Sequence, residues 1–145
     1  MTVKVLPTGK DGTVQLDTVK KLWTDTTAAI VVQSPNFFGI VENASGFSEW
    51  IHSKGGLFIM VCNPLSLGYF KSPGEWGADI ACGELQPLGI PMSYGGPYAG
   101  YFTTTKALMR KVPGRICGET VDMNGACAFT LTLQAREQHI RRERA

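Results

Sequence analysis

The chain has 145 residues, of which 43% are hydrophobic and 18% are charged, with a net charge of +2. This balance is typical of a folded globular domain, and it argues against a disordered chain or a protein with a general affinity for nucleic acid. Residues 1–12 lack the apolar centre of a signal peptide, and no apolar run approaches the ~18 residues of a membrane span. We therefore expect a cytoplasmic protein with no nucleic-acid partner and no membrane partner.

Alternating and periodic patterns in the first half predict two strands and two helices. Residues 3–6 alternate like a strand, and residues 16–22 have helical spacing with Asp17 near the favourable amino end. Residues 28–34 are β-branched and apolar on both faces, which is typical of a central parallel strand. Residues 45–53 form a short amphipathic helix that Gly55 closes.

In the second half, apolar runs at 57–62, 78–82 and 99–103 predict three further strands. A helix is expected over 105–112, a short strand over 129–131 and a polar helix over 133–144. Because strands and helices alternate, the class is α/β with a mainly parallel sheet. The last predicted helix reaches the final residue without a stop signal, so we expect that helix to be truncated.

The cysteines and histidines indicate no metal site. Cys62, Cys82, Cys117 and Cys127 are widely spaced, with no C-x-x-C pair and mostly apolar neighbours. We expect four buried, reduced thiols. The two histidines are far apart in the sequence and do not form an H-E-x-x-H motif, which excludes a typical zinc protease site.

No catalytic motif occurs in the chain. The sequence has no G-x-G-x-x-G, no phosphate-binding loop ending in G-K-[ST] and no G-x-S-x-G elbow, so we assign no catalytic residue. Polar groups follow the predicted strands instead, at the strand ends where open α/β sheets bind ligands. They are Asn63, Glu84, Gln86, Ser93, Gly95 and Gly96. The two glycines could turn their amides towards an anion, or they could simply form a tight turn, which the spacing alone favours.

Several long stretches resemble one protein family. They are VVQSPNFFGIVE, GLFIMVCNPLSLGYFKSPGEWGADIACGE, QPLGIPMSYGGPYAGYF, RKVPGRICGETVD and FTLTLQAREQHIRRE. They are similar to subunit 1 of decarboxylating glycine dehydrogenase, in the P-protein family of the glycine cleavage system. The resemblance implies a three-layer α/β fold, as in the large domain of fold type I pyridoxal-phosphate enzymes. Residues 1–145 would be a single partial domain from the interior of that large domain, with a truncated final helix at 133–145.

The resemblance also implies a degenerate cofactor pocket. Asn63 stands where such enzymes place an aspartate against the pyridine nitrogen, and Pro87 stands where the catalytic sister subunit has its lysine. A proline has no amine to condense with an aldehyde. The pocket residues would be Asn63, Glu84, Gln86, Pro87, Ser93, Gly95 and Gly96, with no covalent cofactor bond to this chain.

The implied function belongs to an assembly. Pyridoxal phosphate and its Schiff-base lysine would lie on subunit 2, and the aminomethyl group of glycine would pass to the lipoyl arm of the H-protein with release of CO₂. The complex would be an oxidoreductase acting on a CH–NH₂ group with a disulfide acceptor, and the isolated piece would be inactive. One alternative is an independent pyridoxal-phosphate enzyme using Lys71 or Lys106, and another is a non-catalytic interaction or scaffold module.

The polar carboxyl-terminal segment offers candidate interface residues, namely Arg136, His139, Arg141 and Arg142. Few apolar side chains accompany them, so the predicted helix cannot rest alone on a core. Arginine is enriched at protein interfaces, which favours contact with a partner subunit. A solvated helix is the alternative, and RNA binding is disfavoured because no aromatic platform accompanies the basic run.

Overall fold

The computed structural model describes residues 2–134. These residues fall into two units, unit 1 (Met1–Thr104) and unit 2 (Thr105–Ala145). The prediction of a single partial domain over 1–145 stays a prediction, and Arg136, His139, Arg141 and Arg142 lie outside the described residues.

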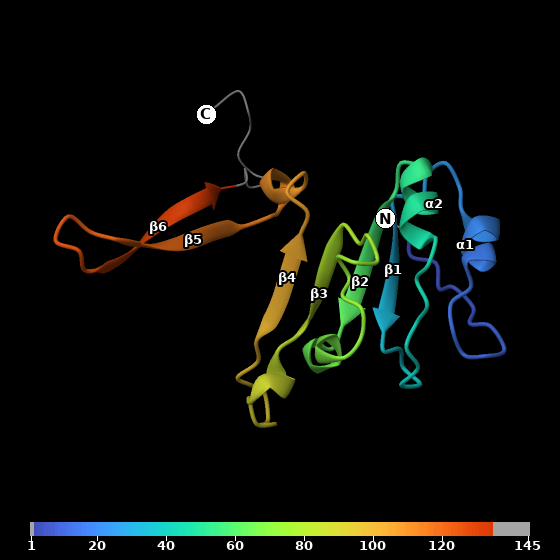
Figure 1. Cartoon of the computed structure of the whole chain (residues 1–145), viewed down its shortest axis with the longest axis horizontal. Helices are drawn as coiled ribbons and strands as arrows, with labels where there is room; N and C mark the ends of the chain where they lie inside the picture. Colours follow the sequence, from blue (N-terminus) through green and yellow to red (C-terminus); the bar gives the residue numbers. More distant parts are fainter. Residues whose placement is uncertain (1, 135–145) are drawn as a thin grey trace. The chain divides into compact units, whose positions relative to one another are not determined.

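Unit 1 is built on a four-stranded sheet in the order β1-β2-β3-β4 (Figure 1). Strands β1 (Ala29–Ser34), β2 (Leu57–Cys62) and β3 (Ile80–Glu84) are parallel, and β4 (Gly100–Thr104) runs antiparallel to β3. The prediction of an α/β class with a mainly parallel sheet is confirmed. The parallel strands all end at one edge of the sheet, where the candidate site lies.

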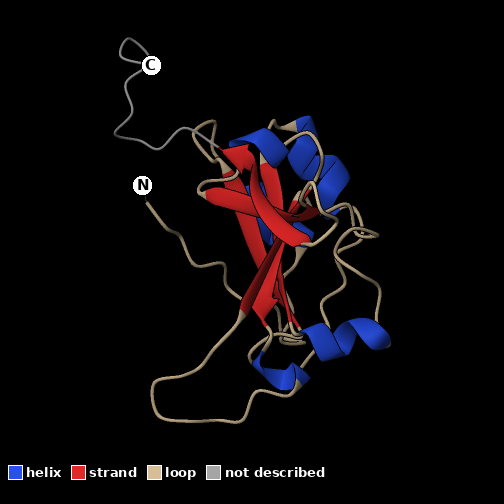
Figure 2. Cartoon of the chain, turned by 90° about the vertical axis from the view of Figure 1, so that its left-hand side faces the viewer, coloured by secondary structure: helices blue, strands red, loops and turns tan. Residues whose placement is uncertain are grey.

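Two short α-helices and two 3-10 helices accompany this sheet (blue in Figure 2). They are α1 (Leu16–Leu22), α2 (Phe47–Ser53), η1 (Pro64–Gly68) and η2 (Gln86–Leu88). Helix α2 begins after Gly46, whose φ of 76° lies in the left-handed region that glycine adopts without a Cβ clash. The predicted helices at 16–22 and 45–53 are confirmed, the second with a slightly later start.

The core of unit 1 lies between one face of the sheet and the two α-helices. Alternate residues of β1 and β2 are buried, among them Val32, Phe58 and Met60. They form one cluster with Phe47 and Ile51 of α2. Each such side chain contributes about 1.5–3 kcal/mol when fully buried. This packing holds the strand ends in place.

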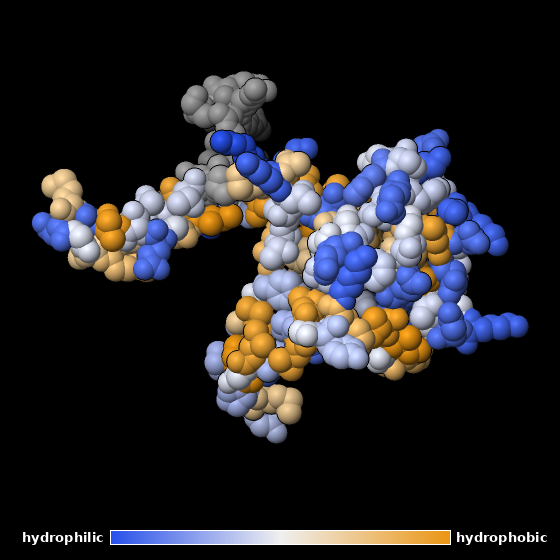
Figure 3. Space-filling model, in the orientation of Figure 1, coloured by the Kyte–Doolittle hydropathy of each residue, from blue (hydrophilic) through white to orange (hydrophobic). Residues whose placement is uncertain are grey.

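The second face of the sheet has no such cover. Val31 of β1 is 58% exposed and Phe102 of β4 is 51% exposed. Strand β1 pairs with β2 alone, so it lies at the edge of the described sheet and not at its centre as predicted. Other apolar side chains also reach the surface of the molecule, as the orange regions of Figure 3 show.

The prediction of an amino-terminal strand at 3–6 is wrong. These residues form no strand, and Val3 and Val5 are more than four-fifths exposed. Leu6 alone among them packs against the core. Residues 3–6 have no neighbouring strand with which to pair, and an unpaired segment gains no inter-strand hydrogen bonds.

Unit 2 contains a β-hairpin, of which the sequence predicted only one short strand. Strands β5 (Arg115–Val121) and β6 (Cys127–Gln134) pair antiparallel, after the 3-10 helix η3 (Met109–Lys111). The α-helix predicted at 105–112 is therefore wrong, because so short a segment before Pro113 gains little from helix propagation. The strand predicted at 129–131 is longer than expected. The helix predicted at 133–144 is wrong at its start, where β6 continues to Gln134, and the rest lies outside the described residues.

The four cysteines are free, as predicted, but not all are buried. Cys62 is buried and Cys82 is half-buried, while Cys117 and Cys127 are exposed on the hairpin. The burial prediction is wrong for these last two. Apolar neighbours in the sequence predict burial only where a second layer covers the strand, and the described residues of unit 2 form a two-stranded ribbon.

Candidate functional site

A hollow of about 360 Å³ lies at the carboxyl ends of β1, β2 and β3. Because these three strands are parallel, the residues that follow them meet at one edge of the sheet. The structure thus brings together Asn63, Glu84 and Pro87 from the predicted set. The full lining is Gln33, Pro35, Asn36, Val61, Cys62, Asn63, Gly83, Glu84 and Pro87.

The side-chain oxygen and the backbone carbonyl of Asn63 both accept hydrogen bonds from residues that follow it in the chain. Its Oδ1 accepts a hydrogen bond from the Leu65 amide at 3.0 Å, and its carbonyl oxygen accepts one from Ser66 Oγ at 2.7 Å. These bonds cap the amino end of η1. An amide side chain in this position carries no charge with which to hold a protonated ring nitrogen.

Glu84, at the end of β3, lines the hollow, and Gln86 follows it without lining the hollow. Glu84 Oε1 accepts a hydrogen bond from the Gln86 amide at 3.1 Å, which fixes the turn into η2. Gln86 Nε2 is buried and has no hydrogen-bond partner among the described residues. Pro87 follows directly and lines the hollow with a ring that offers no amine. The hollow has a carboxylate at its rim and no lysine in its wall.

The predicted loop residues Ser93, Gly95 and Gly96 do not line this hollow. Ser93 Oγ donates to the Gly96 carbonyl, and the Gly96 amide donates back to the Ser93 carbonyl at 3.4 Å. Gly95 and Gly96 have φ values of 83° and 118°. The loop closes on itself as a tight turn, which was the alternative that the spacing favoured.

Cys62 was missed as a site residue, although it borders two hollows. It lines the hollow at the strand ends and also a second one of about 190 Å³. Burial raises the pKa of the Cys62 thiol, and the neighbouring Cys82 adds to the rise. The thiol therefore stays protonated at neutral pH and is a poor nucleophile. Its burial follows from strand register, which the sequence alone does not give.

Tyr101 of β4 contacts the backbone of Cys62, which lines the hollow. Its hydroxyl donates to the Cys62 carbonyl at 2.9 Å, across β3. Burial raises the pKa of Tyr101, with further contributions from the thiolate forms of Cys62 and Cys82. Gly83 lies between the two residues, where a Cβ would overlap both the Cys62 carbonyl oxygen and the Tyr101 ring. Glycine at this position lets the strands approach closely.

Neither alternative lysine lines the hollow at the strand ends. Lys71 borders the second hollow, with its Nζ 4.2 Å from the centre of the Trp76 ring, a cation–π contact. Lys106 belongs to unit 2. An amine placed to form an imine in the larger hollow is therefore missing from the residues that line it.

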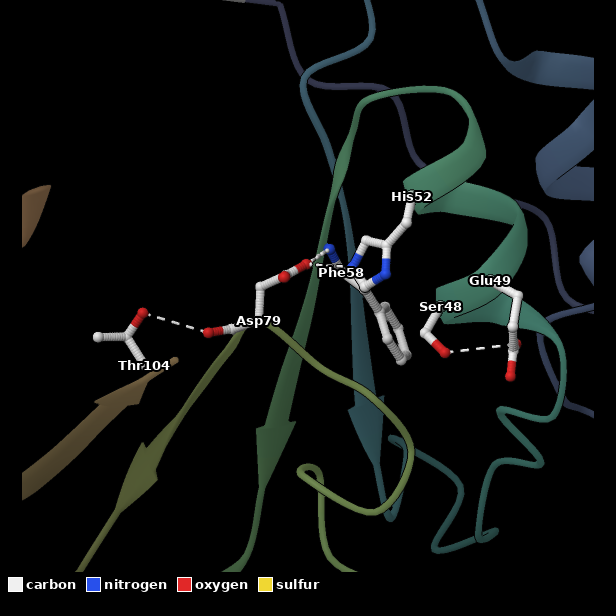
Figure 4. A network of polar contacts seen from close by, with 6 residues as sticks. All are labelled: Ser48, Glu49, His52, Phe58, Asp79 and Thr104. Carbon is white, nitrogen blue, oxygen red and sulfur yellow. Dashed lines mark hydrogen bonds and ion pairs between the residues drawn. The ribbon is translucent and has the colours of Figure 1, made fainter. Parts of the chain in front are cut away.

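A separate polar network lies at the opposite ends of the strands (Figure 4). Asp79 Oδ2 accepts hydrogen bonds from the Phe58 amide and from His52 Nε2, each at 2.8 Å. Thr104 Oγ1 donates to the Asp79 carbonyl at 3.2 Å. These bonds tie α2, β2 and β4 to the start of β3. Sequence reasoning tested His52 only as a metal ligand, and no group of metal-binding side chains occurs among residues 2–134.

Comparison with known families decides the relationship. The profile of the glycine cleavage system P-protein matches residues 3–145. The chain belongs to this P-protein family. The fold agrees: a solved glycine decarboxylase (P-protein) of the glycine cleavage system, in inhibitor-bound form, matches with a TM-score of 0.69 and 52% identity. That match covers 83% of this chain and 28% of the solved chain, and it agrees with the mainly parallel α/β sheet of unit 1.

Curated P-protein relatives give the same picture. Probable glycine dehydrogenase (decarboxylating) subunit 1 proteins from Bacillus thuringiensis, Bacillus cereus and Bacillus anthracis are each 54% identical over 136 residues. The match covers 94% of this chain and 30% of each relative. The chain thus spans less than a third of the length of these P-proteins. None of the helices within the described part of the chain has the length and apolarity of a membrane span.

The residues of the larger hollow do not fit a covalently held pyridoxal phosphate. An aldimine needs a lysine amine, and the lining offers Pro87 at the end of β3 instead. Charge pairing with a protonated pyridine needs a carboxylate at the Asn63 position, where this chain has an amide that already caps η1. The one carboxylate in the lining, that of Glu84, accepts a hydrogen bond from the Gln86 amide instead. No reaction step on the cofactor can therefore be assigned to this chain's residues.

Proposed function

We propose that this chain is part of the non-lysine subunit of decarboxylating glycine dehydrogenase. The observation that carries the proposal is the larger hollow, which has the position of a ligand site at parallel strand ends and no amine in its lining. Family membership supplies the reaction class, and the relatives' designation as subunit 1 implies a second subunit.

In this proposal, subunit 2 carries pyridoxal phosphate and its Schiff-base lysine. The cofactor acts there as the electron sink for glycine decarboxylation. The aminomethyl group then passes to the disulfide of the lipoyl arm of the H-protein. This chain supplies scaffold and interface, with Arg136, His139, Arg141 and Arg142 as candidate contacts to the partner. The cytoplasm is the proposed compartment, and the isolated chain is proposed to be inactive.

A borohydride experiment tests where the imine forms. This chain would replace the matching segment of Bacillus cereus subunit 1, and the resulting chimera would be assembled with its cognate subunit 2 and pyridoxal phosphate. Borohydride reduction followed by peptide mass mapping should find pyridoxyl-lysine in subunit 2 alone. Pyridoxyl-lysine at Lys71 or Lys106 would contradict the proposal and favour an independent pyridoxal-phosphate enzyme.

Activity of the same assembly tests the reaction. The chimera with subunit 2 and H-protein should catalyse exchange between glycine and bicarbonate, while each subunit alone should not. A chimera carrying Lys71→Ala serves as the matched control and should keep the exchange rate, because Lys71 contacts Trp76 and does not line the larger hollow. An assembly that forms but shows no exchange would overturn the proposal.

A further inference from the structure

The second hollow of unit 1, of about 190 Å³, has a floor of buried side chains. Ser34 of β1 and Met60 and Cys62 of β2 line it, and each is at most 8% exposed. The rest of the lining comes from Val41 and from the segment 66–76 after β2, whose lining residues are half-buried or exposed. The hollow therefore has a buried floor and an accessible rim, and the proposed function does not use it.

Apolar and aromatic side chains supply most of this lining. Leu67, Phe70 and Trp76 border the hollow above Met60. An apolar cavity of about 150 Å³ is large enough to hold benzene. A hollow of about 190 Å³ can therefore hold one benzene-sized ring with a short substituent. Aromatic walls favour such a ring, because Phe and Trp gain from edge and offset contacts with other aromatic groups.

The two hydroxyl groups in the lining already have hydrogen-bond partners. Ser34 Oγ accepts a hydrogen bond from the Glu42 amide at 3.2 Å. Ser66 Oγ donates a hydrogen bond to the Asn63 carbonyl at 2.7 Å. Among the described residues that line this hollow, Lys71 alone carries a charge. Its ammonium is therefore the polar group that selects between ligands of different charge.

The Lys71 ammonium lies at the rim and is available to an anion. Its Nζ is 4.2 Å from the centre of the Trp76 ring, and no ion pair joins it to a carboxylate of residues 2–134. Glu75 is near in sequence, but one of its carboxylate oxygens accepts hydrogen bonds from the amide and hydroxyl of Ser72, each at 2.7 Å. The attraction between Lys71 and Glu75 acts at longer range.

We infer that the second hollow binds a small monocarboxylate with a ring-sized apolar body. The body would lie against Phe70 and Trp76, and the carboxylate would pair with Lys71 at the rim. A cationic ligand would be repelled by the same ammonium. The larger hollow has the opposite character, with a carboxylate and no lysine in its lining. The inference rests on the lining of the second hollow and not on the proposed function.

Fluorine NMR of chains labelled with fluorotryptophan tests this site. The probe is benzoate, while benzamide has the same shape without the charge and benzylamine carries the opposite charge. Trp76 lines the hollow, whereas Trp23 and Trp50 pack against each other elsewhere, with ring centres 5.3 Å apart. Trp76→Phe assigns the resonance. Titrations use the 145-residue chain and the chimera with Bacillus cereus subunit 1.

The expected result in both forms is that benzoate shifts the Trp76 resonance and leaves those of Trp23 and Trp50 in place. Benzoate should bind about three- to tenfold more tightly than benzamide, because an ion pair at a partly exposed rim contributes modestly. Benzylamine should bind most weakly. No shift of Trp76, or equal shifts of all three resonances, would overturn the inference. A shift in the 145-residue chain alone would also overturn it, because another part of the subunit would then fill the hollow.

A pair of lysine substitutions identifies the group that selects the charge. Lys71→Met should lower the affinity for benzoate to that for benzamide, which should itself stay unchanged. Lys54→Met is the matched control, because Lys54 also lies over a tryptophan, 5.9 Å from the Trp50 ring centre, but does not line the hollow. A Lys71→Met chain that still prefers benzoate to benzamide would overturn the inference. None of these measurements uses activity, so their failure is distinct from failure of the proposed function.

Discussion

Units 1 and 2 both contain paired strands, yet they differ in what lies against those strands. In unit 1, two α-helices cover one face of the sheet, and every buried hydrophobic residue of the described chain belongs to that unit. In unit 2, the hairpin exposes Val121, Phe129 and Leu131 to at least half of their surface. Strand pairing alone therefore does not build a core. Stability and a shaped hollow come with the second layer.

The largest difference in stability cost is expected when a phenylalanine is replaced by alanine in each unit. Phe58 is fully buried, so Phe58→Ala should destabilise unit 1 by about 3–5 kcal/mol. Phe129 is 72% exposed, so Phe129→Ala should change stability by less than about 0.5 kcal/mol. Urea unfolding followed by tryptophan fluorescence measures the first, and circular dichroism measures the second. A large loss from Phe129→Ala would show that the hairpin has a packed core after all.

The same contrast explains how far the sequence could predict the fold. The strand expected at 57–62 coincides with β2 because its β-branched and apolar side chains meet two neighbouring strands and a helix. The strand expected at 3–6 alternates, but it has no neighbouring strand with which to pair, and residues 3–6 form no strand. Strand β5 was not predicted, because it mixes Glu119 and Thr120 with apolar residues, so its pairing with β6 and not its pattern defines it.

The candidate site was predictable to the same extent. Asn63 and Glu84 come at or just after the ends of apolar runs. Because the carboxyl ends of parallel strands meet at one edge of the sheet, this position predicts correctly that both residues lie at that edge. Cys62 and Gln33 face the hollow only through the register of β1 on β2, which no local pattern specifies. The contact between His52 and Asp79 joins residues far apart in the chain, and it needs the helix and the sheet to be docked first.

A smaller contrast comes from two aspartates that each accept two hydrogen bonds. Asp79→Ala leaves the Phe58 amide in the core without its side-chain acceptor, and it should cost about 1–3 kcal/mol. Asp122→Ala removes bonds from the exposed amides of Asn124 and Ala126 in the hairpin turn, where water replaces the acceptor. Its cost should be below about 1 kcal/mol by urea unfolding.

His52→Ala is the control for the first of these changes. It removes the ring that bonds to Asp79 but keeps the acceptor of the Phe58 amide, so it should cost less than about 1 kcal/mol, as for other partly exposed pairs. If His52→Ala were as damaging as Asp79→Ala, the histidine contact and not the buried amide would be the important interaction.

Substitutions of two glycines should differ in their cost to stability, because one lies in the sheet of unit 1 and the other in the hairpin of unit 2. An added Cβ at Gly83 would overlap backbone at the Cys62 carbonyl, so Gly83→Ala should destabilise unit 1 by about 1–3 kcal/mol. An added Cβ at Gly118 would meet the side chain of Thr132, which can rotate away, so Gly118→Ala should cost less than about 1 kcal/mol. Urea midpoints of the two variants check this order, and a reversed order would contradict the contrast.

The smallest effect concerns pH, and it depends on Cys62, which lines the hollow, and on Tyr101, which donates a hydrogen bond to the Cys62 carbonyl. Burial raises the pKa of Cys62 above its ordinary value of 9.0 and that of Tyr101 above 10.0. The folded chain therefore keeps protons that the unfolded chain releases. Stability from these groups is fully present below about pH 9 and is lost as the pH rises through their folded pKa values.

Urea midpoints measured between neutral pH and pH 10.5 should consequently fall at the alkaline end, and Cys62→Ala should make that fall shallower. Tyr101→Phe should act in the same direction, although it also removes the hydrogen bond to the Cys62 carbonyl and so lowers the midpoint at every pH. Cys127→Ala, which removes an exposed thiol from the hairpin, is the matched control. If all three variants follow the slope of the parent chain, the alkaline loss has its origin elsewhere than in Cys62 and Tyr101.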